Sequence, residues 1–167
     1  MQENHKNEQY FFNEKSQKEL TGFLGNFNSI CCLCTPSLGT HLESAKNNFT
    51  ILDIDKRFEN SKYFKFYDIN KPRWLDHTFE VIICDPPFFN ISLSTLFKAI
   101  RQLSHNNFEQ KVMISYLSRR SNNIVNTFSK FNLNQSGYFP TYKTVQNCEK
   151  NDIEFFSNFK VNINQKD

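Results

Sequence analysis

Residues 79–89, with the sequence FEVIICDPPFF, carry the most informative pattern in this chain. The run from Phe79 to Cys84 is apolar apart from Glu80 and has the length of a buried strand. It stops at Asp85, and the two prolines that follow hold the backbone in an extended path and remove two N–H donors. The stretch therefore predicts a strand whose carboxyl end presents a carboxylate and a bare carbonyl.

On both sides of this stretch, segments with the periodicity of strands and of helices alternate. The predicted strands cover residues 29–34, 50–53, 63–67, 79–84, 112–117 and 154–159. The predicted helices cover residues 14–24, 40–46, 92–103 and 123–131, and a break is predicted at 35–39. This alternation predicts an α/β fold with a mostly parallel sheet flanked by helices, in which ligands bind at the carboxyl ends of the strands.

The chain has 167 residues, the size of one domain. We expect residues 10–159 to form it, between polar tails at 1–9 and 160–167. No apolar run approaches the roughly 20 residues that span a bilayer, and no apolar signal-peptide core is present, so we expect a soluble, cytoplasmic protein without a membrane partner. The net charge of +3 permits a nucleic-acid partner but does not require one.

Glycine and cysteine usage excludes several classes of protein. The chain has only 4 glycines, too few and too scattered for a G-x-G-x-x-G or P-loop sequence, which disfavours kinases, P-loop ATPases and ordinary dinucleotide dehydrogenases. The 5 cysteines are odd in number and most lie in apolar segments, which disfavours a disulfide framework. Because no histidines lie at matching spacing, buried thiols are favoured over a zinc site, and we expect no metal.

Three aspartates, Asp53, Asp68 and Asp85, lie at or just after the ends of predicted strands. Because parallel strands end at one edge of a sheet, the fold predicts these carboxylates along one rim. Strand ends are also loops, and loops are polar in any protein, so this pattern alone leaves an unspecialised surface as the alternative.

The tetrapeptide Asp85-Pro86-Pro87-Phe88 has a more specific chemical meaning. The Asp85 side chain and the Pro86 carbonyl can both accept hydrogen bonds from one amino group, and Phe88 offers a flat apolar face on which stacking contributes about 1–3 kcal/mol per base. This combination is typical of a site for a planar amine. The alternative is a strand end with a proline turn and a core phenylalanine.

These residues resemble the amino-methyltransferases that carry D-P-P-[YF] and use S-adenosyl-L-methionine (AdoMet), and more narrowly the probable adenine-N6 methyltransferase family. That family includes elongation-factor lysine methyltransferases and a zinc-knuckle ribosomal-RNA adenine methyltransferase. The resemblance covers residues 9–159. It rests on five segments in the family's order: Gln9-Tyr10-Phe11-Phe12-Asn13, Cys34-Thr35-Pro36-Ser37, Asp55-Lys56-Arg57-Phe58, Phe66-Tyr67-Asp68-Ile69-Asn70 and Asp85-Pro86-Pro87-Phe88.

The late motifs of the family match less well. Tyr142 stands where the family usually has a histidine, and Asp152 and Ile153 stand where it has Glu and Phe. These departures lie where substrate is expected, so they bear on the identity of the substrate more than on use of the cofactor.

The resemblance implies a Rossmann-like AdoMet-dependent methyltransferase fold and assigns roles to residues. Cofactor binding is expected at Thr35, Pro36, Ser37, Asp53, Asp55 and Asp68. The catalytic site is expected at Asp85, Pro86, Pro87 and Phe88, and substrate contacts at Phe89, Phe11 and Asn151. For the ribose hydroxyls, Asp53 has the better position and Asp55 the better motif match, although an ion pair with Lys56 or Arg57 is the alternative for Asp55.

The resemblance favours adenine N6 as the acceptor, in a single-stranded or flipped base, and RNA over DNA. A protein lysine on a translation factor is the alternative acceptor, because the same carboxylate and carbonyl can position its amine. A non-catalytic methyltransferase-like subunit is the third hypothesis, and the intact D-P-P-F argues against it. The pair Arg119-Arg120 is a candidate phosphate contact or simply solvated surface, and a partner subunit is expected to supply targeting.

Overall fold

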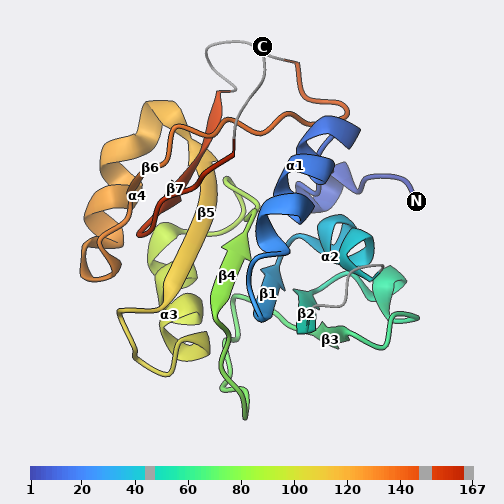
Figure 1. Ribbon diagram of the computed structural model, residues 1–167, viewed down its shortest axis with the longest axis horizontal. Coiled ribbons are helices and arrows are strands. Elements are labelled where there is room, and N and C mark those ends of the chain that lie inside the picture. The colour runs from blue at the N-terminus through green and yellow to red at the C-terminus, as the bar shows by residue number, and fades with distance from the viewer. Residues whose placement is uncertain (44–47, 147–151, 164–167) are drawn as a thin grey trace.

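A seven-stranded sheet forms the centre of the computed structural model, which describes residues 1–43, 48–146 and 152–163 (Figure 1). The strands are β1 (Ser29–Leu33), β2 (Asn48–Asp53), β3 (Phe64–Phe66), β4 (Val81–Cys84), β5 (Lys111–Leu117), β6 (Asn134–Gln135) and β7 (Ile153–Ser157). Their spatial order is β3-β2-β1-β4-β5-β7-β6. The first five strands pair in parallel, and β7 runs antiparallel to both of its neighbours.

The order of the strands reverses between β1 and β4, so the chain leaves these two neighbouring strands in opposite directions. In sheets of this kind the loops that diverge at such a point open a ligand-binding crevice. The predicted α/β fold with a mostly parallel sheet is confirmed. Strand β6 was not predicted, because a pair of exposed residues has no detectable periodicity.

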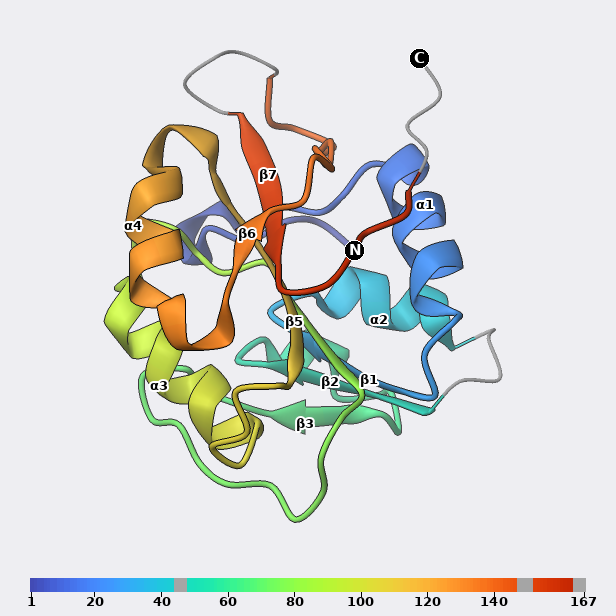
Figure 2. The same ribbon diagram turned by 60° about the vertical axis from the view of Figure 1, so that its left-hand side comes forward.

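Helices cover both faces of the sheet (Figure 2). The helices are α1 (Glu14–Leu24), α2 (Pro36–Leu42), α3 (Leu93–Leu103) and α4 (Ser121–Thr127). Successive side chains of a strand point to opposite faces. In β1, Ile30 and Cys32 accordingly pack in the cluster of α1 and α2, and Cys31 and Leu33 in that of α3 and α4.

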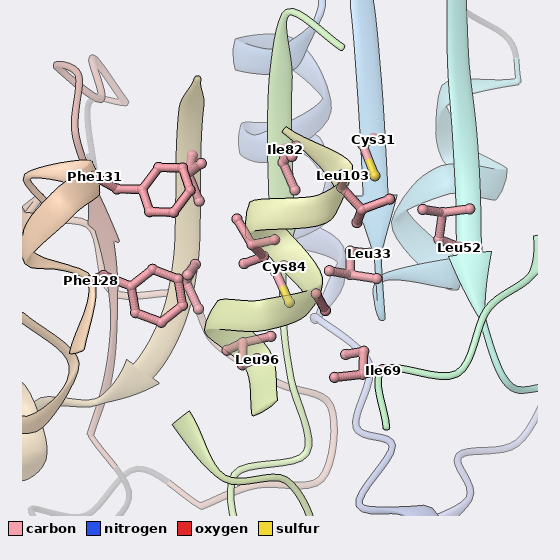
Figure 3. Close-up of a cluster of buried hydrophobic side chains, with 14 of the residues drawn as sticks. Cys31, Leu33, Leu52, Ile69, Ile82, Cys84, Leu96, Leu103, Phe128 and Phe131 are labelled. Atoms are coloured by element: carbon pink, nitrogen blue, oxygen red, sulfur yellow. The ribbon is translucent and has the colours of Figure 1, made fainter. Parts of the chain in front are cut away.

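The core under α3 and α4 includes Phe128 and Phe131, which Figure 3 shows. Phe97 of α3 packs edge-on against Phe128 and Phe131, with ring centroids 5.5 Å and 5.8 Å apart. Leu96 and Leu103 of the same helix lie fully or almost fully buried against the sheet. Edge-to-face pairs of this kind add about 0.5–1.5 kcal/mol each to the burial of their area, so this cluster fixes α3, which follows directly from the D-P-P-F loop.

The break predicted at 35–39 and the helix predicted at 40–46 are corrected by the structure. Helix α2 begins at Pro36 and ends at Leu42, with Pro36 in its first turn. Proline is compatible with a first turn because the N–H it lacks has no partner inside the helix. The last residues of the predicted helix, 44–47, lie outside the described residues.

The helix predicted at 123–131 is divided in the structure. Helix α4 covers Ser121–Thr127, and a 3-10 turn, η4 (Ser129–Phe131), follows it. Asn132 then adopts a left-handed conformation, with φ of 57°, and ends the segment. An Asn at this position favours termination, since its short polar side chain tolerates the left-handed region.

Residues 1–9, expected from their polarity to form a tail, are held against the domain. A 3-10 turn, η1 (His5–Asn7), is closed by a bridge between Asn4 and Gln9. Arg57 donates to the backbone carbonyl of Gln2 and to Oε1 of Gln9, at 3.0 Å and 2.8 Å. The segment thereby lies beside the loop that follows β2. Within the described parts of the chain, no helix has the length and apolarity needed to cross a bilayer.

Gly39 permits the close approach of α2 to β2. A Cβ placed on Gly39 lies 2.7 Å from Cδ1 of Ile51 and closer still to its Cγ1. We expect Gly39→Ala to lower the free energy of unfolding by about 1–3 kcal/mol, because the added methyl group overpacks this contact. Chemical denaturation measures the change.

Gly22→Ala in α1 is the matched control, because nothing lies within 4 Å of a Cβ at Gly22. The same methyl group there removes only the helix-weakening effect of glycine, so a gain of roughly 0.5–1 kcal/mol is expected. Equal stability of the Gly39→Ala protein and the unmodified protein would show that α2 moves away from β2 without cost.

Candidate active site

The carboxyl ends of β1, β2 and β4 bring Cys34, Asp53 and Asp85 to one groove. The backbone N–H of Asp85 donates to the carbonyl of Leu33 at 3.3 Å, and that of Cys34 to the carbonyl of Leu52 at 2.9 Å. A cleft of about 50 Å³ lies between these three side chains and residues 7–9 of the N-terminal segment. The sheet itself therefore gathers the carboxylates that the sequence placed at strand ends.

The groove continues past Cys34 into a second cleft of about 200 Å³. The two clefts share Asn7, Cys34, Ile54 and Pro87 as lining residues. The second also reaches Tyr67 and Asp68, which follow β3. Together the clefts form one groove that runs across the ends of β3, β2, β1 and β4.

Cys34 occupies a turn beside the groove where glycine is the usual residue, because glycine lets a ligand approach the backbone closely. Its φ is 55°, in the left-handed region that costs a non-glycine residue roughly 1–2 kcal/mol. The residue nevertheless keeps the turn after β1 tight, so that α2 starts two residues later at Pro36. The absence of a glycine-rich loop in the sequence therefore does not prevent a turn into the groove.

Asp53 and Asp55 both line the narrow cleft, in different electrostatic settings. Burial raises the pKa of Asp53 to about 6, against the effect of the backbone N–H of Asp55, which donates to Oδ1 of Asp53 at 2.7 Å. Burial also raises the pKa of Asp55, but hydrogen bonds from Arg57 and Gln9 outweigh it and lower the pKa below its usual value. Arg57 Nη2 lies 2.7 Å from Oδ2 of Asp55. The ion pair weighed for Asp55 is therefore present, with Arg57.

Of the other residues expected to bind the cofactor, only Asp68 lines the groove. Asp68 lines the second cleft and accepts the backbone N–H of Asn70 at 2.9 Å. Thr35, Pro36 and Ser37 form the start of α2 and line neither cleft of the groove. The reason is the early start of α2, which folds these residues into a helix and leaves Cys34 facing the groove.

Asp85 is partly buried and accepts hydrogen bonds from two hydroxyl groups. Ser115 Oγ donates to its Oδ1, and so does the Tyr142 hydroxyl, at 2.8 Å. Burial raises the pKa of Asp85 to about 7, and the two hydrogen bonds, which favour the charged form, lower it only in part. Ser115 belongs to β5, and Tyr142 to the segment between β6 and β7, so the carboxylate is held by two distant parts of the chain.

The two phenylalanines after the prolines separate two further clefts. Phe88 is half-buried and packs edge-on against Tyr116, with centroids 5.5 Å apart. Phe89 is 66% exposed, and the guanidinium of Arg120 lies 5.7 Å from its ring centroid. One cleft, of about 360 Å³, is lined by Tyr10, Glu8 and both phenylalanines, and another, of about 440 Å³, by both phenylalanines, Tyr116 and Arg120.

Glu8 connects the N-terminal segment to this loop. Its Oε2 accepts the backbone N–H groups of Phe89 and Asn90, at 3.1 Å and 3.0 Å. It also lines both the narrow cleft of the groove and the 360 Å³ cleft. Glu8 therefore marks the boundary between the groove and the 360 Å³ cleft, which we call the aromatic cleft.

Phe11, expected to contact substrate, does not line these clefts. Phe11 is only 4% exposed and packs edge-on against Phe58 with centroids 6.3 Å apart. Its ring is used in packing because residues 11–13 pair with residues 141–143. Asn151 lies outside the described residues.

Glu8, Ser115 and the contact of Tyr142 with Asp85 were not predicted from the sequence. Ser115 lies within an apolar strand, where one serine carries no signal of its own. Tyr142 stood out only as a departure from the expected histidine, and Glu8 only as part of a polar stretch. Each contact depends on tertiary structure that local pattern does not encode.

Solved structures that resemble this fold include AdoMet-dependent methyltransferases. A putative RNA methyltransferase from Pyrococcus horikoshii has a TM-score of 0.61 and 15% identity, over 93% of this chain and 89% of its own. Magnesium protoporphyrin IX methyltransferase from Synechocystis PCC 6803 with bound AdoMet has a TM-score of 0.60 and 12% identity, over 86% and 77%. The N-methyltransferase NodS from Bradyrhizobium japonicum WM9, in complex with S-adenosyl-L-homocysteine, has a TM-score of 0.53 and 12% identity, over 86% and 85%.

At these identities the structures establish the class of fold, a Rossmann-like AdoMet-dependent methyltransferase. The chain belongs to the probable N6-adenine methyltransferase family, which it matches over residues 3–161. No protein of curated function matches it. The protein is therefore a methyltransferase, and its cofactor is AdoMet.

The raised pKa of Asp85 gives a prediction about stability. The folded protein holds the proton of Asp85 more tightly than the unfolded chain does. The free energy of unfolding therefore falls as pH rises to about 7, and above that pH the loss is complete. We expect Asp85→Asn, which keeps an oxygen for Ser115 and Tyr142, to raise Tm by about 5 °C at pH 8 and by less at pH 5.

Thermal unfolding of both proteins at the two pH values measures this effect. A gain at pH 5 as large as the gain at pH 8 would show that the Asp85 carboxylate is not the titrating group responsible.

Proposed function

We propose that this protein methylates the N6 amine of adenine in a single-stranded or flipped nucleotide, in RNA rather than DNA. The observation that carries the proposal is the position of the D-P-P-F loop. Asp85 lies in the groove at the strand ends, and Phe88, three residues later, lines the adjoining aromatic cleft. One planar group can therefore place its amine at Asp85 and its ring against Phe88.

The residues of the groove fit AdoMet. Asp53, at the end of β2, offers a partly desolvated carboxylate as acceptor for the ribose hydroxyls. Ile54 and Ile69 give apolar faces for the adenine ring, and Asp68 offers an acceptor for its amine. When bound, AdoMet supplies a methyl group attached to a sulfonium, and the electron pair of the C–S bond stays on sulfur when a nucleophile takes the methyl group.

The role of Asp85 is to hold and deprotonate the acceptor amine. Its carboxylate accepts one N–H, which localises the nitrogen lone pair and aims it. As the N–C bond forms, the nitrogen carries one proton too many, and a carboxylate with a pKa of about 7 accepts that proton near neutral pH. The Pro86 carbonyl is the acceptor for the second N–H of the amine.

Phe88 and Phe89 are the stacking surfaces for the flipped base and its neighbour. Arg120 lies over the exposed ring of Phe89, where a guanidinium can contact a phosphate without being withdrawn into an ion pair with a carboxylate. Arg57, by contrast, is already paired with Asp55.

A protein lysine is the second candidate, and one observation favours it. The 360 Å³ cleft combines the Glu8 carboxylate with the aromatic rings of Tyr10, Phe88 and Phe89. Aromatic faces and a carboxylate bind an ammonium group before it loses its proton. The same Asp85 then acts on an aliphatic amine instead of an aromatic one.

The test is incubation with methyl-labelled AdoMet and separate undermethylated RNA, DNA and protein fractions, alongside Asp85→Ala. Label in RNA that digests to N6-methyladenosine, reduced at least a hundredfold in the variant, is the expected result. Label confined to protein, recovered as methyl-lysine, would replace adenine by lysine as the substrate.

The cofactor assignment is tested by calorimetry. We expect Asp53→Asn to weaken AdoMet binding about tenfold to a hundredfold at pH 8, since hydrogen bonds to a charged group contribute about 1.5–3 kcal/mol. We also expect the affinity of the unmodified protein to fall below pH 6, as Asp53 takes up a proton.

Glu59→Gln, an equivalent loss of charge at an exposed position after η2 (Lys56–Phe58), is the control and should bind AdoMet normally. Unchanged affinity in the Asp53→Asn protein would transfer the ribose contact to another residue.

A further inference from the structure

Three segments far apart in the sequence meet at one oxygen atom. Asp85 follows β4, Ser115 lies in the neighbouring strand β5, and Tyr142 lies between β6 and β7. The hydroxyl groups of Ser115 and Tyr142 both donate to Oδ1 of Asp85. Among the residues that the structure describes, these two provide the side-chain hydrogen bonds to this carboxylate.

Two donors on one oxygen have a directional consequence. They stabilise the charged form of a partly desolvated carboxylate, and they prevent its rotation about the Cβ–Cγ bond. They also use the hydrogen-bonding capacity of Oδ1. The other oxygen, Oδ2, is then the one left to accept an N–H from a ligand in the groove.

Tyr142 is itself held rigidly. The backbone N–H of Lys143 donates to the carbonyl of Phe11, and that of Asn13 to the carbonyl of Thr141, both at 2.9 Å. The rings of Tyr142 and Phe12 pack with centroids 5.0 Å apart. Residues 11–13 therefore act as a short strand that fixes residues 141–143, and with them the hydroxyl that reaches Asp85.

The Tyr142 hydroxyl remains a donor at any working pH. Burial and the nearby Asp85 carboxylate raise the pKa of Tyr142 well above its ordinary value. Ser115, which is fully buried in β5, does not titrate either. The two contacts are thus constant over the pH range in which Asp85 changes charge.

We propose that Ser115 and Tyr142 are positioning residues for amine methylation, which hold Oδ1 of Asp85 so that Oδ2 faces the acceptor amine. This proposal rests on the role of Asp85 in the proposed function. It gives a reason for the aromatic segment at residues 11–13, which takes no part in the clefts but places Tyr142.

The first test measures the charge state of Asp85 without any substrate. Carbon-detected NMR of the aspartate carboxyl groups gives the pKa of Asp85 in the unmodified protein, Tyr142→Phe and Ser115→Ala. Because each substitution removes a donor that favours the charged form, the pKa of Asp85 should rise in both variants. Ser115→Thr, which keeps the hydroxyl group, should restore the original value.

The second test follows the pH dependence of kcat/KM with the methyl acceptor found by the labelling experiment. Both variants should lower kcat about tenfold or more and move the acid limb to higher pH, with affinity for AdoMet unchanged. Tyr138→Phe is the matched control. It removes a tyrosine hydroxyl that donates to Glu19 at 2.9 Å, away from the groove, and should leave the acid limb in place.

The outcomes separate the two proposals. If the pKa of Asp85 in both Tyr142→Phe and Ser115→Ala equals that of the unmodified protein, the positioning role is wrong. If the pKa rises as expected but the unmodified protein labels no amine, the hydrogen bonds hold Asp85 for another purpose, and both the positioning role in methylation and the proposed function fail. If Tyr142→Phe does not fold, Ser115→Ala gives the same measurement by itself.

Discussion

The candidate active site depends on placing the Asp85 carboxylate partly out of bulk water at the point where the order of the strands reverses. A charge in that position is expensive unless donors surround it. The parallel half of the sheet supplies one donor through β5, and the antiparallel return of the chain through β6 and β7 brings the other. The mixed character of the sheet is therefore more than a matter of topology. Without the antiparallel strands, residues 141–143 would not lie beside the carboxyl end of β4.

A second charged contact organises the other side of the groove. Arg57, held by Asp55, also binds the backbone of Gln2 and the side chain of Gln9. Glu8 in turn accepts from the backbone of the loop after the prolines. The N-terminal segment is thus fastened to the loops that follow β2 and β4, the strands at whose ends Asp53 and Asp85 lie. The cleft that residues 7–9 of this segment line has a volume of about 50 Å³. The end of this polar segment therefore forms one wall of the groove.

Local sequence pattern predicted much of the scaffold and part of the site. Strands such as β4 and helices such as α3 were correctly predicted, because their periodicity is a property of adjacent residues and matches their burial. The carboxylates at strand ends followed from the sheet. Pattern failed where tertiary contacts decide. Pro36 starts a helix instead of ending a strand, Phe11 packs inside instead of facing substrate, and Tyr142 acquires its partner only when residues 11–13 pair with its segment.

The groove also contains a thiol, that of Cys34, whose reactivity depends on its charge state. Cys34 stands beside Asp53 and Asp85, in the groove that fits a methyl donor. A hydrogen bond with Cys84 lowers the pKa of Cys34, but burial and the charges of Asp53 and Asp85 outweigh it and raise the pKa above its ordinary value. The thiolate is the nucleophilic form of cysteine, and here it is suppressed. Burial and the two carboxylates together therefore keep Cys34 in its protonated, less reactive form beside the groove that fits the cofactor.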